Sequence, residues 1–234
     1  MEISENIIAT SWDSRALGIK TFEIIYTSDV QLRNTLEKVF NQKVKGHYTV
    51  KINPLSLSSK KLLHDFGFYY CDTLLEPYCV FKNLVFYEKN GIEVESVSVD
   101  DFQKISSIIH DNFKYDRFHR DFNIDQNIAD LRYNLWLKDL CNSNQVFSLK
   151  FFGDLAGFWA YSNNKILLHA LSKNYQGKGL SKYFWSLACQ KLFKKGYQEL
   201  TSSISASNVA VLNLYSSLGF NFRNPVDVYH FLFE

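Results

Sequence analysis

The stretch Asn174–Phe184, NYQGKGLSKYF, places a Gly-Lys-Gly elbow between an apolar run and an amphipathic segment. The run before it, Lys165–Leu171, is almost wholly hydrophobic and predicts a central strand. After the elbow, apolar residues recur at helical spacing as far as a capping glycine, Gly196. Glycines let the backbone approach a bulky anion, and the first amides of a helix favour negative charge. The elbow therefore predicts a phosphate site, with a plain tight turn as the alternative.

The sequence around the elbow predicts alternating strands and helices. Gly153-Asp154 separates two apolar runs and is a favoured hairpin turn. Nearer the C-terminus, a segment that begins at Ser207-Asn208 and ends at Gly219 predicts a helix with an Asn or Ser cap. The predicted elements are strands at Val146–Phe152, Leu155–Ser162 and Lys165–Leu171, the helix after the elbow, a strand at Gln198–Ser205, the helix ending at Gly219 and a strand at Val226–Phe233.

The N-terminal part predicts a β-α-β-α-β order of its own. A helix with an Asp cap at Asp29 and a helix ending at Gly67 separate three apolar segments. A middle region then adds a strand, a helix capped near Asp100, the polar loop KYDRFHRD and a longer helix. The predicted ranges are strands at Thr21–Tyr26, Tyr48–Ile52, within Tyr69–Phe81 and at Ile92–Val97, with helices at Asp29–Gln42, Ser56–Phe68 and about Asp125–Leu140.

The two ends of the chain resemble each other weakly. LLHDFGF at 62–68 matches LYSSLGF at 214–220, so that Gly67 aligns with Gly219 and Leu63 with Tyr215. The alternative is that any two βαβα segments align this well. The N-terminal counterpart of the elbow, TSDVQ, has no glycine and carries Asp29, which would repel phosphate. The repeat therefore predicts an N-terminal domain at 1–88, which cannot bind the same ligand, and a second domain at 89–234.

Composition excludes several classes of protein. The 234 residues are 46% hydrophobic and 16% aromatic, which supplies a sizeable core and argues against disorder. A net charge of +2 gives no reason to expect nucleic acid or a membrane surface as partner. Neither a signal peptide nor a run of roughly 20 apolar residues is evident, so we expect a cytoplasmic protein. The four cysteines have no CxxC spacing and are expected to be buried thiols, with no metal.

The elbow matches a known signature. A P-loop would need GxxxxGK[ST], a Rossmann fingerprint would need another spacing, and no nucleophile elbow is present. YQGKGLS instead resembles the Q/R-x-x-G-x-G/A signature of the GNAT N-acetyltransferases, through Gln176, Gly179 and Ser181. Asn208 with LYSSLGF resembles the second acetyl-CoA segment of that family. The resemblance covers roughly residues 92–234, and Ser181 departs from it by replacing Gly or Ala.

The resemblance implies an α/β (α+β) fold of the GNAT type. This is a mixed, mostly antiparallel central sheet flanked by helices, here preceded by an N-terminal half-GNAT-like βαβαβ domain. It also implies that Tyr215 is the general acid that protonates the departing thiolate of acetyl-CoA, the co-substrate; a core aromatic is the alternative. The implied contacts of acetyl-CoA are with the end of a splayed strand, the elbow and the second segment, namely His169, Ala170, Leu171, Gln176, Gly177, Lys178, Gly179, Leu180, Ser181 and Asn208.

Other stretches of the sequence concern the acceptor, the amine that receives the acetyl group. SWDSRALGI at 11–19 and DRFHRD before a helix containing Trp136 resemble the GNAT enzymes that acetylate TDP-fucosamine, a dTDP-linked 4-amino-4,6-dideoxyhexose of cell-surface polysaccharide synthesis. That resemblance implies that Arg117 and Asp121 bind the acceptor and that His119 accepts a proton from its amine. The alternative is that DRFHRD only caps a helix and pins a loop. His169 is a second candidate base, with a hydrogen-bonded core histidine as the alternative.

The sequence thus predicts an acetyl-CoA-dependent N-acetyltransferase for the amine of a nucleotide-activated amino sugar. A GNAT enzyme for another small amine or a protein amine is the first alternative. A degenerate GNAT domain that binds acyl-CoA without catalysis is the second. A small-molecule substrate is the expected partner, and a homodimer is compatible with the sequence.

Overall fold

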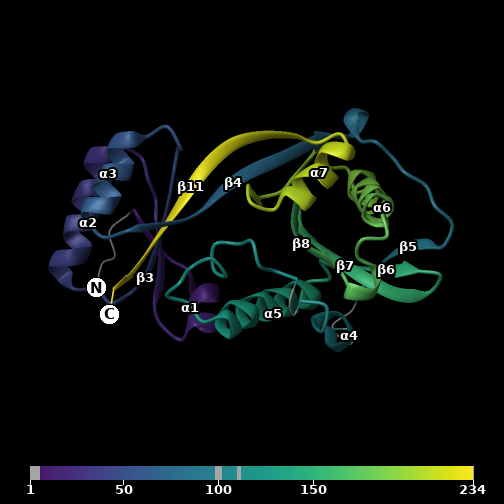
Figure 1. Cartoon of the computed structure of the whole chain (residues 1–234), viewed down its shortest axis with the longest axis horizontal. Coiled ribbons are helices and arrows are strands. Elements are labelled where there is room, and N and C mark those ends of the chain that lie inside the picture. Colours follow the sequence, from purple (N-terminus) through teal and green to yellow (C-terminus); the bar gives the residue numbers. More distant parts are fainter. Residues whose placement is uncertain (1–5, 98–101, 110–111, 234) are drawn as a thin grey trace. The chain divides into compact units, whose positions relative to one another are not determined.

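The computed structural model describes residues 6–97, 102–109 and 112–233, so the cap predicted near Asp100 lies outside the described residues. The chain divides into two compact units (Figure 1). Unit 1 comprises residues 1–74, 115–132 and 225–234, and unit 2 comprises residues 75–114 and 133–224. Each unit is therefore built from separate segments of the chain. The division at residue 88 that the sequence suggests stays a prediction.

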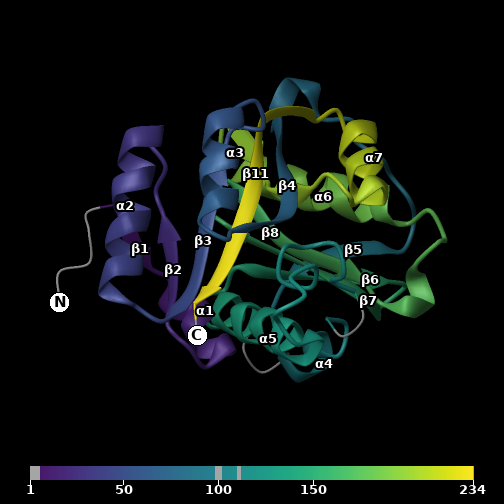
Figure 2. The same cartoon turned by 60° about the vertical axis from the view of Figure 1, so that its left-hand side comes forward.

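Unit 1 is a small sheet with two helices packed along it (Figure 2). Its central pair of strands, β2 (Thr21–Ile24) and β3 (Gly46–Ile52), is parallel. β1 (Ile7–Ala9) pairs with β2 and the end of β11 (Asn221–Phe233) pairs with β3, both antiparallel. The apolar core lies between the sheet and the helices α2 (Asp29–Gln42) and α3 (Leu57–Asp65).

The start of α2 corrects one detail of the sequence-based expectation. Ser28, and not Asp29, is the N-cap, because its hydroxyl accepts a hydrogen bond from the Gln31 amide at 3.2 Å. Asp29 lies in the first turn and accepts hydrogen bonds from Tyr26, Ser58 and Ser59. It therefore joins the first turns of α2 and α3. The hydroxyl groups of these serines hold the pKa of Asp29 below its ordinary value.

Unit 2 is a larger sheet with helices on both faces (Figure 1). Alternate residues of its strands face opposite sides: Trp159 and Tyr161 pack with the helices α6 and α7, whereas Phe158 and Ala160 pack with residues of α4 and α5. The strands are β5 (Ile92–Ser96), β6 (Val146–Phe151), β7 (Asp154–Ser162), β8 (Lys165–Leu171), β9 (Glu199–Thr201) and the end of β4 (Tyr69–Val80); the helices are α4 (Phe102–Ser106), α5 (Gln126–Asn142, which begins in unit 1), α6 (Ser181–Lys194) and α7 (Val209–Ser217).

This architecture confirms the predicted fold class. β5 to β8 form an antiparallel meander, and β9 pairs parallel to β8 and antiparallel to β4. The hairpin turn lies one residue earlier than expected, at Phe152-Gly153, and both residues have a positive φ, 51° and 84°. The strand predicted at Gln198–Ser205 is interrupted into β9 and β10 (Ile204–Ser205). β1 and α1 (Ser11–Leu17) were not predicted.

The two sequence halves exchange their last strands. β4 follows α3 along the chain, yet its residues Tyr78–Val80 pair with β9. β11 follows α7, yet its residues Asp227–Phe233 pair with β3. The helix–strand junctions correspond, because Gly67 and Gly219 both have a positive φ, 79° and 85°. The repeat in the sequence is thus matched by equivalent connections whose strands enter the sheet of the other half.

Candidate active site

The elbow after β8 leaves a helix N-terminus open. Gly177 and Gly179 have φ values of 70° and 68°, a region that side chains rarely adopt. Apart from the glycine and its two chain neighbours, no heavy atom of the described residues lies within 4 Å of where a Cβ of either glycine would stand. Within the described chain, no side chain caps α6, which begins at Ser181 after Leu180. The Tyr183 amide donates to the carbonyl of Leu180 at 3.1 Å, and the amides before it in the first turn are left to bind water or an anion.

Gln176 holds the elbow against the end of β8. Its side-chain amide donates to the carbonyl of Leu171 at 2.8 Å and to Oδ1 of Asn112 at 2.5 Å. The position of the turn is thus fixed by contacts within the protein. Lys178 extends along the elbow, with its Nζ 5.6 Å from the ring centre of Tyr175.

β8 is open on one side at the same end. Its residues His169, Ala170 and Leu171 pair with Trp159, Phe158 and Gly157 of β7. Within the described residues, the ladder between β8 and β9 is confined to Lys165 and Thr201. Beyond that pair the backbone of β8 forms no further ladder with β9, and side chains occupy two of its carbonyls, that of Ile166 from Ser202 and that of Leu171 from Gln176.

Gly157 is a close-packed position on β7 that the sequence analysis missed. A Cβ at this position would lie 2.3 Å from the carbonyl oxygen of Ala170, so only glycine allows β7 to approach β8 this closely. The signal that was available is a glycine in the interior of an apolar strand, which often marks a close backbone approach.

Tyr215 lies beneath the open part of β8. The side chain is fully buried, and its hydroxyl is 3.1 Å from Nε2 of His169, on β8. Burial raises the pKa of Tyr215 above its ordinary value. Burial also lowers the pKa of His169 to about 4, so that the imidazole is neutral at pH 7. The protonated phenol of Tyr215 is therefore in contact with the neutral imidazole of His169. Asn208, by contrast, caps α7 by accepting a hydrogen bond from the Val211 amide at 3.3 Å.

The three predicted acceptor residues lie in unit 1 and are engaged by protein groups. Both ring nitrogens of His119 contact carboxylates, Nδ1 with Asp116 at 2.5 Å and Nε2 with Asp130 at 3.2 Å. Burial opposes protonation of His119, but these carboxylates raise its pKa overall. This arrangement favours the loop-pinning alternative. The guanidinium of Arg117 lies 4.6 Å over the ring of Phe118.

Asp121 is fully buried in a polar cluster that it forms with His47, Tyr69 and His230, called here the Asp121 cluster. Its Oδ2 accepts from Nδ1 of His230 at 2.7 Å and from Nε2 of His47 at 3.1 Å. Its Oδ1 accepts from the Tyr69 hydroxyl at 3.0 Å. Burial alone would raise the pKa of Asp121, but these donors lower it well below the ordinary range. Asp121 is therefore an anionic centre that joins distant segments of unit 1.

The donor atoms of His47, Asp121 and His230 lie within 4.8 Å of one another and are of types that bind metals. The direct hydrogen bonds already satisfy Asp121. Nε2 of His230 has no hydrogen-bond partner in the described part of the protein, whereas a metal-bound histidine usually donates its second nitrogen. The geometry therefore favours a hydrogen-bonded cluster over a metal centre.

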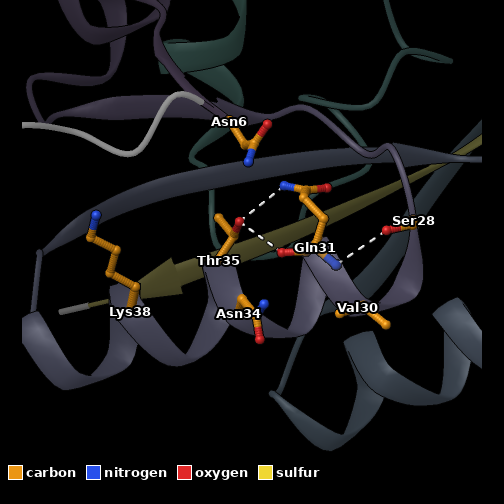
Figure 3. Close-up of a pocket in the computed structure, with 7 residues that line it drawn as sticks. All are labelled: Asn6, Ser28, Val30, Gln31, Asn34, Thr35 and Lys38. Carbon is orange, nitrogen blue, oxygen red and sulfur yellow. Dashed lines mark hydrogen bonds between the residues drawn. The ribbon is translucent and has the colours of Figure 1, made fainter.

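A pocket of about 330 Å³ lies at the start of α2 in unit 1 (Figure 3). It is lined by Asn6, Ser28, Val30, Gln31, Asn34, Thr35 and Lys38. Here Ser28 already occupies the first-turn amide of Gln31, as the dashed line in Figure 3 shows. In the sequence repeat, the start of α2 corresponds to the elbow before α6. The Ser28 side chain caps α2, whereas no side chain of the described residues caps α6.

Comparison with known proteins agrees with this geometry. Residues 112–220 match the model of the acetyltransferase (GNAT) family. No curated protein matches the sequence. None of the helices described here has the length and apolar composition needed to span a membrane.

Solved structures share the fold at low sequence identity. A GCN5-related N-acetyltransferase from Sphaerobacter thermophilus aligns with a TM-score of 0.66 and 10% identity, over 97% of this chain and 76% of its own. A GNAT-family acetyltransferase from Colwellia psychrerythraea aligns with a TM-score of 0.57 and 13% identity, over 90% of this chain and 76% of its own. A tandem GNAT protein from the clavulanic acid biosynthesis pathway aligns with a TM-score of 0.56 and 7% identity, over 92% of this chain and 75% of its own. Residues 112–220 thus match the acetyltransferase (GNAT) family, and the chain shares the fold of solved GNAT acetyltransferases.

Proposed function

We propose that this protein transfers the acetyl group of acetyl-CoA to the amine of a dTDP-linked 4-amino-4,6-dideoxy sugar. Binding of the acetyl donor is supported by the uncapped N-terminus of α6 and by the end of β8 that forms no ladder with β9. Tyr215 contacts His169 at that end of β8. The acceptor half rests on the sequence resemblance of SWDSRALGI and DRFHRD. The product would enter cell-surface polysaccharide synthesis, such as that of O-antigen, in the cytoplasm.

Each part of the donor site has a distinct role in this proposal. The amides at 177–181 bind the pyrophosphate, because they carry the positive end of the α6 dipole and have room around both glycines. The backbone edge of β8 at His169, Ala170 and Leu171, which forms no ladder with β9, binds the amide-bearing pantetheine arm. Bound acetyl-CoA supplies the activated acetyl thioester.

Tyr215 acts as the proton donor in this proposal. A thiol has an ordinary pKa near 8.5, and a phenol retains its proton to higher pH, so Tyr215 is protonated when the sulfur leaves. Its burial strengthens this protonated state. The carboxylate partners of His119 favour a role in holding the 115–125 loop, but acceptance of the amine proton by His119 stays a prediction.

A panel of acceptors tests the proposal. Purified protein is given acetyl-CoA with dTDP-4-amino-4,6-dideoxyhexoses of both C4 epimers, polyamines and lysine peptides, and thiol release and acetylated product are measured. We expect turnover of a dTDP-amino sugar with a kcat/KM at least tenfold above the other amines. Turnover confined to polyamines or peptides would replace the acceptor assignment. Binding of acetyl-CoA by calorimetry without turnover of any amine would favour a non-catalytic acyl-CoA module.

A further inference from the structure

The contact between His169 and Tyr215 has a defined setting within unit 2. The imidazole projects from β8, with the ring of Trp185 at 4.9 Å on one side and the Tyr215 hydroxyl at 3.1 Å from Nε2. Ser202 is buried beside the same phenol. The phenol therefore has two polar neighbours in an otherwise apolar core.

The direction of the hydrogen bond between His169 and Tyr215 follows from the role proposed for the phenol. The Ser202 hydroxyl donates to the carbonyl of Ile166 at 3.0 Å. With its only proton used there, Ser202 has no proton to offer the phenol oxygen. A phenol that gives its own proton to the leaving sulfur can still accept with its oxygen, and Nε2 of His169 is 3.1 Å from that oxygen. In the proposed reaction the donor of this pair is therefore Nε2–H of His169.

We propose that His169 is a positioning residue for Tyr215, with Nε2–H donating to the phenol oxygen throughout acetyl transfer. The proposal rests on the function proposed above, because it concerns the same proton donor. The hydrogen bond fixes the phenol oxygen beside β8, and it leaves the phenol proton free to pass to the leaving sulfur.

The same hydrogen bond acts when the proton moves. The acceptor nitrogen forms a bond to the acetyl carbon, and the C–S bond breaks with its electron pair on sulfur. The phenol proton passes to that sulfur, and the phenolate oxygen recovers a proton released by the acceptor nitrogen. Burial makes the phenolate costly, so a donor on its oxygen lowers the barrier. The other titratable neighbours are Cys189 of α6 and, next to it, Cys79 of β4, whose pKa values burial raises, so neither supplies a charge.

Two variants separate this role from a structural one. His169→Leu removes the donor, whereas His169→Gln keeps an amide N–H near the position of Nε2. For His169→Leu we expect kcat on the dTDP-amino sugar to fall about 10- to 100-fold, the worth of a hydrogen bond to a charged group. His169→Gln should retain most of the activity. The dissociation constant of acetyl-CoA, measured by calorimetry, should change less than twofold in both.

A double-mutant cycle supplies the decisive comparison. In a Tyr215→Phe background, His169→Leu should cause no further loss of kcat, because the residue acts through the phenol. Multiplying losses would overturn the proposal, and so would a His169→Gln variant that is as impaired as His169→Leu.

A measurement without turnover tests the same hydrogen bond directly. ¹⁵N NMR of histidine-labelled protein, with His169→Gln to assign the signal, should show a neutral imidazole protonated at Nε2. Protonation at Nδ1 would overturn the proposal. If the wild type acetylates no amine, the proposed function fails, while this spectrum still decides whether His169 donates to Tyr215.

Discussion

At the scale of single residues, glycines in unit 2 are required for two different reasons. Gly157 has no space for a Cβ, because the Ala170 carbonyl stands 2.3 Å from that position. Gly179 has space but an unusual backbone, with φ at 68°. Gly157 sets the distance between β7 and β8, whereas Gly179 leaves the space beside the elbow free of side-chain atoms. Substitution therefore has different consequences at the two positions.

Gly179→Asp and Gly179→Asn form a matched pair that tests the elbow. Both side chains tolerate a positive φ and have nearly the same shape, so their effects on folding should be similar. Only the aspartate places a negative charge where the pyrophosphate is proposed to bind. We expect calorimetry to show acetyl-CoA binding weakened at least tenfold more by Asp than by Asn. Equal affinities in two folded variants would show that the elbow is not the anion site.

Tyr215→Phe tests the general acid. The ring keeps its edge-to-face contact with Phe220 at 4.8 Å, so the melting temperature should change little. Acetyl-CoA affinity should also be retained, because the proposed contacts are with backbone amides. We expect kcat to fall by about 10²-fold or more, since general acid catalysis contributes roughly 10²–10⁴. A stable variant with nearly wild-type kcat would mean that Tyr215 only packs, or that another step limits the rate, which a pre-steady-state burst would distinguish.

At the scale of elements, the Asp121 cluster shows how a loop is attached to a sheet. His47 belongs to β3 and His230 to β11, while Asp121 lies on the loop before α5. These partners are 74 and 109 residues from Asp121 in the sequence. Both histidines are buried, and donation to one carboxylate accounts for their presence in the core.

The variant His230→Asn tests how the buried His230 makes the free energy of unfolding depend on pH. Burial lowers the pKa of His230 to about 3 despite the opposing effect of Asp121, whereas an unfolded histidine titrates near 6.5. Below pH 6.5 the unfolded chain therefore binds a proton that the folded protein does not. The free energy of unfolding should fall by up to about 1.4 kcal/mol for each pH unit between 6.5 and 3 from this group. Asparagine keeps an N–H for Asp121 but does not titrate.

Urea unfolding at pH 6.5 and pH 5.0 measures the difference. Wild type should lose about 2 kcal/mol more than His230→Asn over this interval. His169 contributes in the same direction to both proteins, and Asp121 titrates below the interval, so neither changes the comparison. Equal losses in both proteins would indicate that His230 is not the group that takes up the proton on unfolding.

Local patterns were enough to predict most elements but not the polar contacts between them. α2 and β8 lie at the predicted residues, because each has a clear apolar period and distinct ends. β1 and α1 were missed since three and seven residues are too few to show a period. The elbow was found because its glycines lie together in the sequence. The partners of Asp121 could not be found, because no spacing rule joins residues that meet only in the folded sheet.

At the scale of the whole molecule, the exchange of strands makes the two halves of the chain interdependent. All seven residues of β3 pair with Asp227–Phe233 of β11, at the other end of the sequence. β9 pairs with Tyr78–Val80 of β4 from the N-terminal half. A chain cut at the repeat boundary therefore leaves each sheet without a strand that the other fragment carries. An exposed strand with unpaired N–H and C=O groups is prone to aggregate.

We accordingly expect that neither residues 1–88 nor residues 89–234 fold alone, although each contains a full half of the repeat. Circular dichroism and proton–nitrogen NMR of the separate fragments should show no cooperative unfolding and little signal dispersion. Mixing them should restore both, because the mixture supplies β11 to β3 and β4 to β9. Acetyl-CoA binding should return only in the mixture, since β4 supports β9 and β9 in turn pairs with the start of β8, the strand proposed to bind the pantetheine arm. A fragment of residues 89–234 that is folded and binds acetyl-CoA as the full chain does would show that the exchanged strands are dispensable, and that the boundary at residue 88 separates independent domains.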